Sequence, residues 1–404
     1  MAREAVVILN GARTPMAEWV GGRAGNGKPG GALKDVSAID LGVVASKAAL
    51  ERSHVPPDIL DHVVFGNALQ TSGDAIYGAR HVALKSGVPV PVPALTLNRL
   101  CGSGIQAVIT SAQMLELGEA NFVLAGGIEN MSQAPFVIRG ARSGLRLGQG
   151  ALEDSLLVAL KDSYCGCFMA ETSDNLARRY KISREEQDAY AFRSITEGRR
   201  AIDSCLLSEE IVPVTLPGRD AKKVEKDDHC FEGATLEGLA KLAPAFGKDG
   251  FVTAGNASGI VDGAAAVVVT TERHAEKRDL EPIGRIVSWS VVGVDPDTMG
   301  IGPVPATRAA LKQAGMTVDD VDLFEINEAF AGQYLAVEKE LGNPREKTNV
   351  NGGAIALGHP LAATGTRLIL TLLYELRRRK GRRGVASACI GGGQGIAIVV
   401  ESLA

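Results

Sequence analysis

Residues 93–132 read PALTLNRLCGSGIQAVITSAQMLELGEANFVLAGGIENMS, and this stretch decides the fold. Its first part, PALTLNRL, is extended, CGSG turns the chain, and the residues that follow are helical, with Gly118 placed to end the helix. NFVLAGGIENMS then forms a second strand that leads into another glycine turn. A strand, a helix and a strand in succession predict parallel α/β layering.

The C-terminal part of the chain repeats this order of elements. It contains a strand, a helix, a strand that ends in polar residues, a long helix with one apolar face and a final pair of strands around a glycine turn: 282–293, 303–315, 321–330, 366–381 and 384–401. In both parts a glycine turn with a reactive side chain precedes a helix, a strand and a second glycine turn. The similarity lies in order rather than in residue identity, and it predicts a duplicated α/β unit.

The segment between the two units differs from them in its pattern of predicted elements. Residues from about 130 to 255 hold charged helices and loops without strong strands, including a helix that starts with a capping-box pair, Ser183 and Glu186. We interpret this segment as an insertion on the α/β body. The predicted domains are therefore 1–129 plus 259–281, an inserted loop domain 130–258, and 282–404.

Composition narrows the class of protein. The chain has 404 residues, of which 45% are hydrophobic and 22% charged, as is typical of soluble globular proteins. A net charge of -4 gives no attraction to nucleic acid or to an anionic membrane, and no apolar run is long enough to span a bilayer. The six cysteines do not form a disulfide framework, and no signal peptide is recognisable, so we expect a cytoplasmic protein with reduced thiols.

Cys101 is the first candidate for chemistry. A cysteine at the start of a helix faces unpaired backbone N–H groups and the positive end of the helix dipole, which favour the thiolate. Glycines 102 and 104 leave room for a substrate beside the backbone. A buried and inert free cysteine is the competing interpretation, and the local sequence does not decide between the two.

Four residues in the C-terminal part complete a possible site. His359 lies in a glycine-rich turn that opens a helix, and a cysteine and a histidine distant in sequence can form a nucleophile–base pair. Cys389 repeats the setting of Cys101 at the end of a strand, and the N–H of Gly391 could stabilise an oxyanion. Asn327, followed by Glu328, ends a strand as a polar residue and could orient a water, although such residues also simply finish strands.

The motifs together resemble the thiolase family. They occur in the family's order and at similar spacings over almost the whole chain: NRLCGSG (98–104), VTAGNASGIVDGAA (252–265), NEAFA (327–331), NVNGGAIALGHP (349–360) and ACIGGGQGIA (388–397). The resemblance implies a layered α-β-α-β-α fold of two similar α/β halves with an inserted loop domain. It also implies an enzyme that joins or cleaves carbon–carbon bonds in acyl-CoA without metal or redox cofactor.

The resemblance implies a role for each catalytic candidate. Cys101 would accept the acyl group from CoA, His359 would deprotonate it, and Cys389 would take the α-proton of a second acetyl-CoA. His359 with a water on Asn327 would form one oxyanion hole, and the N–H groups of Cys101 and Gly391 the other. Further residues would contact the pantetheine arm or line its tunnel, with core packing as the competing interpretation: Ser258, Ala254, Met169, Phe246, Ala329 and Phe330.

The chain departs from common family patterns at three positions. Phe168 stands where many acetoacetyl-type members have a histidine, Phe231 where some relatives have an arginine near the nucleotide end of CoA, and Ala362 where glycine is frequent. The glycine-rich stretch 21–31 resembles an insertion and is expected to be an exposed loop.

Two further features are discounted. Cys165 and Cys167 with His229 and Cys230 fit no usual zinc spacing, so no metal site is expected. The basic run 377–383 is expected to be a solvated helix end rather than a nucleic-acid contact.

The sequence favours an acetyl-CoA C-acetyltransferase that acts by a ping-pong route, with acyl-CoA and CoA as small-molecule partners. A 3-ketoacyl-CoA thiolase for longer chains is the alternative, and a non-catalytic CoA- or lipid-binding relative is a remote one. The chemistry needs no cofactor because the CoA thioester is the substrate. We expect a homodimer or a homotetramer from the same resemblance.

Overall fold

The computed structural model describes residues 4–19, 31–218 and 221–403. Most of the strands form one twisted ten-stranded sheet, in which nine strands lie side by side and the tenth, β2 (Ala17–Glu18), pairs with one of them. The glycine-rich stretch 21–31 lies outside the described residues except for Gly31. None of the helices in the described ranges is long and apolar enough to cross a membrane.

The N-terminal half contributes five strands to this sheet. They are β1 (Val6–Arg13), β3 (His62–Gly66), β4 (Ala94–Leu97), β5 (Phe122–Glu129) and β10 (Val261–Thr271). β3 is parallel to β4 and to β5, whereas β10 is antiparallel to both β5 and β1. The helices of this half are α1 (Ala38–Arg52), α2 (Gly78–Lys85) and α3 (Ser103–Glu116). As predicted, Gly118 ends α3 in a left-handed conformation, with φ at +73°.

The C-terminal half repeats the pattern. Its strands are β11 (Gly284–Gly293), β12 (Leu323–Ile326), β13 (Arg383–Ile390) and β14 (Gln394–Ser402). β12 is parallel to β13, and β14 is antiparallel to both β13 and β11, so the order β11-β14-β13-β12 matches β1-β10-β5-β3. In place of a counterpart to β4, the C-terminal half has a single parallel bridge between Phe324 and Thr348. Its helices are α9 (Pro303–Ala314), α10 (Ala331–Leu341), α11 (Ala354–Leu357) and α12 (Leu361–Arg379).

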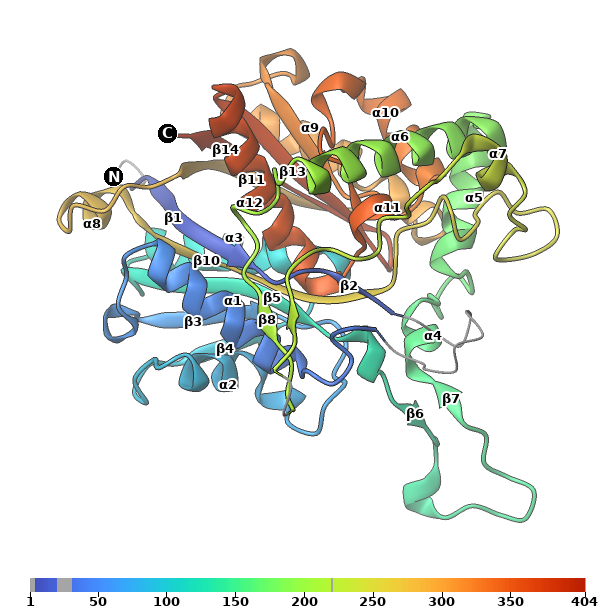
Figure 1. Ribbon diagram of the computed structural model, residues 1–404, viewed down its shortest axis with the longest axis horizontal. Helices are drawn as coiled ribbons and strands as arrows, with labels where there is room; N and C mark the ends of the chain where they lie inside the picture. Colours follow the sequence, from blue (N-terminus) through green and yellow to red (C-terminus); the bar gives the residue numbers. More distant parts are fainter. Residues whose placement is uncertain (1–3, 20–30, 219–220, 404) are drawn as a thin grey trace.

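The two halves stack in layers, which confirms the predicted architecture (Figure 1). Val7 and Leu9 of β1 point into a core shared with α1 and α2, whereas Val6 and Ile8 point to the opposite face, against α3 and α12. A third core lies between the C-terminal strands and α9 and α10. β1 pairs with β11, which joins the strands of both halves into one sheet, and the two parts of this sheet pack on either side of α3 and α12. The layers are therefore helix, sheet, helix, sheet, helix.

The central helices approach closely because glycine stands at their contact. A Cβ on Gly104 of α3 would lie 2.7 Å from the carbonyl oxygen of Ala362, and one on Gly365 of α12 would lie 2.3 Å from the backbone nitrogen of Ile105. Side chains at these two positions would push the helices apart. The first turns of α3 and α12 are thus held backbone to backbone at one end of the molecule.

The segment between the halves contains mostly helices and very short strands. α5 (Met169–Tyr180) and α6 (Arg184–Asp203) pack on the C-terminal half, and Ser183 with Glu186 forms the predicted capping box. The remaining short elements of this segment are β6 (Phe136–Val137), β7 (Glu153–Asp154), α4 (Ser155–Ala159), β8 (Val214–Thr215), β9 (Lys223–Val224) and α7 (Leu236–Ala240). The N-terminal half has one further short helix, α8 (Glu272–Glu276). On this arrangement we propose the division into 1–129 plus 259–281, 130–258 and 282–404.

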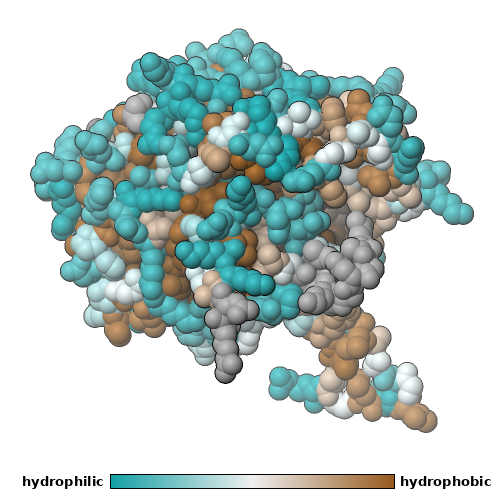
Figure 2. Space-filling view, viewed as in Figure 1, coloured by the Kyte–Doolittle hydropathy of each residue, from teal (hydrophilic) through white to brown (hydrophobic). Residues whose placement is uncertain are grey.

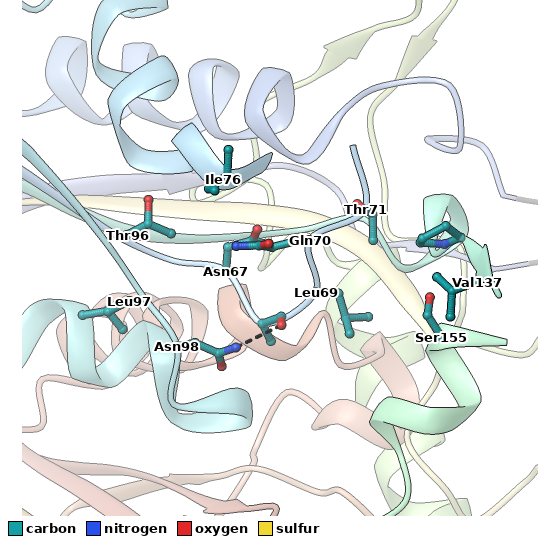
Figure 3. A pocket seen from close by; sticks show the side chains of 12 residues that line it. Asn67, Leu69, Gln70, Thr71, Ile76, Thr96, Leu97, Asn98, Val137 and Ser155 are labelled. Carbon is teal, nitrogen blue, oxygen red and sulfur yellow. Dashed lines mark hydrogen bonds between the residues drawn. The ribbon is translucent and has the colours of Figure 1, made fainter. Parts of the chain in front are cut away.

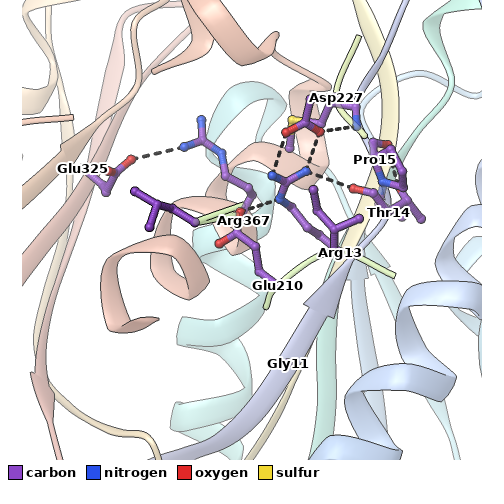
Figure 4. A network of polar contacts seen from close by, with 12 residues as sticks. Gly11, Arg13, Thr14, Pro15, Glu210, Asp227, Glu325 and Arg367 are labelled. Atoms are coloured by element: carbon purple, nitrogen blue, oxygen red, sulfur yellow. Dashed lines mark hydrogen bonds and ion pairs between the residues drawn. The ribbon is translucent and has the colours of Figure 1, made fainter. Parts of the chain in front are cut away.

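A buried ion-pair cluster fastens this segment to the first strand (Figure 4). The guanidinium of Arg13 is fully buried and lies 2.6 Å from Oε1 of Glu210 and 2.6 Å from Oδ1 of Asp227. Both carboxylates belong to the segment after α6, whereas Arg13 ends β1. The ion pairs hold β1 and the segment after α6 in one arrangement, because separating them would leave a buried charge without a partner, at a large cost in free energy.

Candidate active site

Cys101 lies between β4 and α3, in a single 3₁₀ turn, Leu100–Gly102, that precedes the α-helix. Its side chain is partly buried against apolar residues that include Leu361, at the start of α12. Burial raises the pKa of the Cys101 thiol to about 11, and the nearby Glu129 carboxylate adds to this shift. The expectation of a thiol pKa lowered by the helix is therefore wrong, because loss of hydration outweighs the backbone hydrogen bonds. The thiol is neutral at pH 7 and needs a base.

His359 is placed at the equivalent position of the other half, in the turn before α12. Its Nδ1 lies 2.6 Å from Oγ1 of Thr364, and that hydroxyl donates its own hydrogen to the carbonyl of Pro360 at 3.0 Å. The hydroxyl oxygen must therefore accept the Nδ1–H of His359, which assigns the lone pair to Nε2. Burial and the charge of Arg367 lower the pKa of His359 to about 3, so the ring is neutral at pH 7 and Nε2 carries its lone pair.

Asn327 follows β12 and faces this nitrogen. Its Nδ2 lies 3.4 Å from Nε2 of His359, and its backbone N–H donates to the carbonyl of Ser387 on β13 at 2.9 Å. The side-chain Oδ1 is buried and has no hydrogen-bond partner among the described residues. A buried amide oxygen without a protein partner is suited to hold a water molecule.

Cys389 and Gly391 come from the end of β13 and the turn after it. Cys389 is fully buried, and burial, followed by the neighbouring Cys101, raises the pKa of its thiol. The backbone N–H groups of Gly391 and of Cys101 itself act to lower the pKa of the Cys101 thiol, although burial outweighs them. Backbone N–H groups from the two halves therefore both act on this one sulfur atom.

Glu328 fixes the loop that carries Asn327. Its buried carboxylate accepts hydrogen bonds from Tyr190 Oη at 2.6 Å, Ser194 Oγ at 2.7 Å, Asn349 Nδ2 at 2.9 Å and the backbone N–H of Ile355 at 3.1 Å. These donors come from α6 and from the segment that leads to His359. Glu328 thus ties the asparagine and histidine loops to one another.

The predicted pantetheine contacts gather around a cavity of about 420 Å³. Ala254, Ser258, Phe246 and Phe330 all line it. Ala329 lies deeper: its carbonyl accepts the backbone N–H of Ser258 at 3.0 Å. Ala329, Met169 and Phe330 belong to one apolar cluster with Cys389, so this cluster connects the cavity to the reactive side chains.

Of the two phenylalanine departures, Phe231 lines this cavity and Phe168 contacts a residue that lines it. The ring of Phe168 contacts that of Phe246, with centroids 5.0 Å apart, so an apolar wall stands where many relatives have a histidine. Phe231 lines the cavity next to His229, with ring centroids 5.8 Å apart. Phe231 offers no hydrogen bond to a phosphate.

Two residues of the site were missed in the sequence. Thr364, in the first turn of α12, selects the tautomer of His359. Glu129, at the end of β5, is fully buried and accepts the backbone N–H groups of Ala68, Leu69 and Ala362 at 3.0 to 3.2 Å. Burial raises the pKa of Glu129 to about 7. A polar residue at the end of an apolar strand, as in NEAFA, was the signal for Glu129.

The discounted features do not join the site. Cys230 is buried beneath α6, where its thiol donates to the carbonyl of Ile195 at 3.5 Å, and Cys165 and Cys167 lie in the loop before α5. The part of the chain that the structure describes contains no group of three or more His, Cys, Asp or Glu residues able to hold a metal ion. The basic run 377–383 ends α12 and pairs with carboxylates on the surface, as predicted for a solvated helix end.

Comparisons with known proteins agree with this arrangement. Residues 6–273 match the family description "Thiolase, N-terminal domain", and residues 280–402 match "Thiolase, C-terminal domain". The chain is 52% identical over 401 residues to the mitochondrial 3-ketoacyl-CoA thiolase of Homo sapiens, covering 99% of this chain and 98% of that protein. It is 45% identical over 408 residues to an acetyl-CoA acetyltransferase of Syntrophomonas wolfei, covering both chains completely.

A solved structure extends the comparison to three dimensions. The crystal structure of human mitochondrial 3-ketoacyl-CoA thiolase in complex with CoA superposes with a TM-score of 0.94, covering 99% of this chain and 98% of that chain at 49% identity. Both family descriptions, the identity over the full length and the shared fold lead to one conclusion: the chain belongs to the thiolase family.

Proposed function

We propose that this protein is an acetyl-CoA C-acetyltransferase, which condenses two acetyl-CoA reversibly to acetoacetyl-CoA and CoA. The observation that carries the proposal is the meeting of the two halves at the Cys101 sulfur: the N–H groups of Cys101 and Gly391 both favour its thiolate, and the Cys389 thiol lies beside it. A carbonyl attacked by this sulfur would place its developing oxyanion near both donors, and such fixed donors stabilise a tetrahedral intermediate.

In the first half-reaction, Nε2 of His359 takes the proton of the Cys101 thiol, and the sulfur attacks the carbonyl carbon of acetyl-CoA. The tetrahedral intermediate collapses with loss of the CoA sulfur, which takes a proton from the Cys389 thiol. The products are acetyl-Cys101, free CoA, a Cys389 thiolate and a protonated His359. Splitting the reaction at a covalent thioester turns one difficult step into two easier ones.

In the second half-reaction, the Cys389 thiolate takes the α-proton of another acetyl-CoA. The enolate oxygen receives hydrogen bonds from Nε2–H of His359 and from a water held by Asn327. The enolate carbon attacks the acetyl carbonyl on Cys101, whose oxyanion lies at the N–H groups of Cys101 and Gly391. Collapse expels the Cys101 sulfur, which regains its proton from His359, and all four side chains return to their starting states.

The pantetheine arm would occupy the cavity beside Ala254, Ser258, Phe246 and Phe330, with Met169 and Ala329 at its inner end. The support is the position of these residues between the open surface and Cys389. CoA enters as part of the substrate, and the proposed steps use no metal or other cofactor.

Acyl-chain length is the point at which a second function competes. The apolar contact of Phe168 with Phe246, and the 52% identity to a 3-ketoacyl-CoA thiolase, favour longer chains as the alternative substrates. Thiolysis rates on 3-ketoacyl-CoAs of increasing length test this choice directly. A kcat/KM that is highest for the four-carbon substrate supports the acetyltransferase, whereas a rise with chain length assigns the alternative.

We also propose that the protein is a homo-oligomer, a dimer or a tetramer. β4 ends the sheet of the described residues with one hydrogen-bonding edge unpaired, and beside it lies a hollow of about 510 Å³ lined by Thr96, Leu97 and Asn98 (Figure 3). An open strand edge is suited to pairing with another copy.

A second feature supports an assembly of copies. The arm around β6 and β7 projects from the body and presents Phe136, Leu147 and Leu152, all strongly exposed (Figure 2). Exposed apolar side chains on a projecting segment are suited to a contact with another subunit. Light scattering on the purified protein measures the assembly, and a monomer at micromolar concentration would contradict it.

We propose a cytoplasmic location, although some relatives are named as mitochondrial. It rests on the six cysteines, which are all free, as is usual in a reducing compartment. Fractionation of cells that express the untagged chain tests it.

A further inference from the structure

The loop between α4 and α5 carries two cysteines in the order Cys165-Gly166-Cys167. It is a closed turn: Lys161 and Phe168 form an antiparallel bridge, the N–H of Asp162 donates to the carbonyl of Cys167 at 2.9 Å, and the N–H of Gly166 donates to the carbonyl of Asp162 at 2.8 Å. The mechanism above uses neither thiol.

The Cys167 thiol turns back over Gly166 toward Cys165 and donates to the Cys165 carbonyl at 3.8 Å. Burial, followed by the side chain of Cys165, raises the pKa of Cys167, and both cysteines are partly exposed to solvent. Gly166 has φ at +78° and bends the chain, with open space around its α-carbon. Cα atoms two residues apart are separated by at most about 7 Å, and a bent chain brings them within the range of about 4.4–6.8 Å that a disulfide requires.

We propose that Cys165 and Cys167 form a redox-active dithiol that closes to an intramolecular disulfide by exchange with a small-molecule disulfide. The thiolate of Cys165 attacks one sulfur of the small disulfide, breaks its S–S bond and releases one small thiol. The thiolate of Cys167 then attacks the Cys165 sulfur of the mixed disulfide and releases the second small thiol. The protein loses two protons and two electrons, and the small disulfide takes them up and is reduced to two thiols.

The position of this loop makes the change matter for the site. Cys167 is followed directly by Phe168, whose ring lies on Phe246 in the cavity wall, and then by Met169. A Cβ added to Gly391 would meet the sulfur of Met169 at 3.3 Å, so Met169 lies against the turn that holds an N–H on Cys101. A disulfide would tighten the turn at Cys167 and shift Phe168, which contacts Phe246 of the cavity wall, and Met169, which belongs to the apolar cluster with Cys389.

A metal site is the competing use of two close thiols. Within the described ranges no third histidine, cysteine or carboxylate joins them in a group that could hold a metal ion. Partly exposed cysteines in a short strained ring are, in contrast, typical of labile disulfides that respond to redox conditions.

Peptide mapping tests the disulfide without reference to activity. Trypsin cleavage after Lys161 and Arg178 releases one peptide with both cysteines and no other thiol, and Cys205, a single exposed cysteine, lies in a different peptide. The full-length protein is equilibrated in glutathione buffers of graded potential, quenched with acid and alkylated. The peptide is expected to lose two hydrogen atoms at a more reducing potential than that at which Cys205 takes up glutathione.

Two results would overturn the proposal. One is a 162–178 peptide that remains a dithiol while Cys205 is modified, and the other is a peptide that carries glutathione without an internal disulfide. In the variant with Cys165→Ser and Cys167→Ser, the 162–178 peptide should neither lose two hydrogen atoms nor take up glutathione. Cys205→Ser is the matched control for loss of an unrelated thiol.

The effect on the site rests on the proposed function and is measured separately. In the oxidised wild-type protein, KM for the 3-ketoacyl-CoA should rise about tenfold, comparable to the loss of one good apolar contact, and dithiothreitol should reverse it. The double serine variant should retain the KM of the reduced protein in the same buffers. An unchanged KM in the oxidised protein refutes the link to the site, whereas a reduced protein without any thiolysis refutes the proposed function instead.

Discussion

The hydroxyl of Thr364 accepts the Nδ1–H of His359 at 2.6 Å while it donates to the carbonyl of Pro360 at 3.0 Å. This contact leaves Nε2 as the only ring nitrogen with a lone pair. The same nitrogen faces Asn327 at 3.4 Å. Thr364, in the first turn of α12, therefore sets the tautomer of the proposed base without a part of its own in the proposed steps.

Replacing Thr364 with valine should lower kcat about tenfold with little change in KM, because one hydrogen bond of about 1 kcal/mol that holds the tautomer is lost. Thr364→Ser keeps the hydroxyl and should restore most of the rate. Steady-state thiolysis measures both variants, and an equal loss in the serine variant would assign Thr364 to packing alone.

Replacing Cys389 with alanine should abolish condensation but leave acylation of Cys101 measurable. The leaving CoA thiolate can take its proton from water instead of Cys389, whereas the second half-reaction needs the Cys389 thiolate as a base. Mass spectrometry of the acid-quenched protein after exposure to acetyl-CoA reports the acyl-enzyme, and a coupled assay reports condensation. Loss of both in a correctly folded variant contradicts the role given to Cys389.

Alkylation of Cys101 should depend steeply on pH. With its pKa raised to about 11 by burial, the thiolate fraction rises about tenfold per pH unit between pH 7 and pH 10. The rate of iodoacetamide labelling of Cys101, followed by peptide mapping, should rise without a plateau, whereas a free thiol levels off above its ordinary pKa of about 8.5. A plateau near neutral pH would show a preformed thiolate–imidazolium pair.

Arg13→Met should destabilise the fold. It leaves the buried carboxylates of Glu210 and Asp227 without their cation, and breaking such a pair costs about 3–5 kcal/mol. Asp35→Asn is the control, since the exposed pair of Asp35 with Lys34 contributes at most about 1 kcal/mol. Urea unfolding measures the free energy of unfolding of both variants. Equal losses of stability would show that the Arg13 ion pairs do not hold the segment to β1.

The order of elements could be predicted from the sequence because the periodicity of apolar residues and the glycine turns are local signals. The segments before and after Cys101 gave β4 and α3, and the repeat of that order predicted the layered halves. The parallel bridge of Phe324 and Thr348 could not be predicted, since a single bridge has no periodicity. Residues 130–255 were recognised only as an insertion, because their short strands are fixed by tertiary contacts.

The side chains of the candidate site were named from motifs, but their electrostatics were not predictable. The helix after Cys101 suggested a lowered thiol pKa, whereas burial beside Glu129 raises it. Burial depends on Leu361 and the rest of α12, far away in the sequence. Thr364 was missed for the same reason: a threonine in a helix gives no sign that it faces a histidine.

The most direct test of the proposed mechanism is the site of acylation. The wild-type protein is mixed with acetyl-CoA, quenched in acid within one turnover and digested with trypsin, which releases Cys101 in a peptide that begins at Leu100. We predict one acetyl group on that peptide, absent in Cys101→Ser, which should also lose thiolysis. An acetyl group on another residue, or thiolysis that persists in Cys101→Ser, would contradict the assignment of Cys101 as the nucleophile.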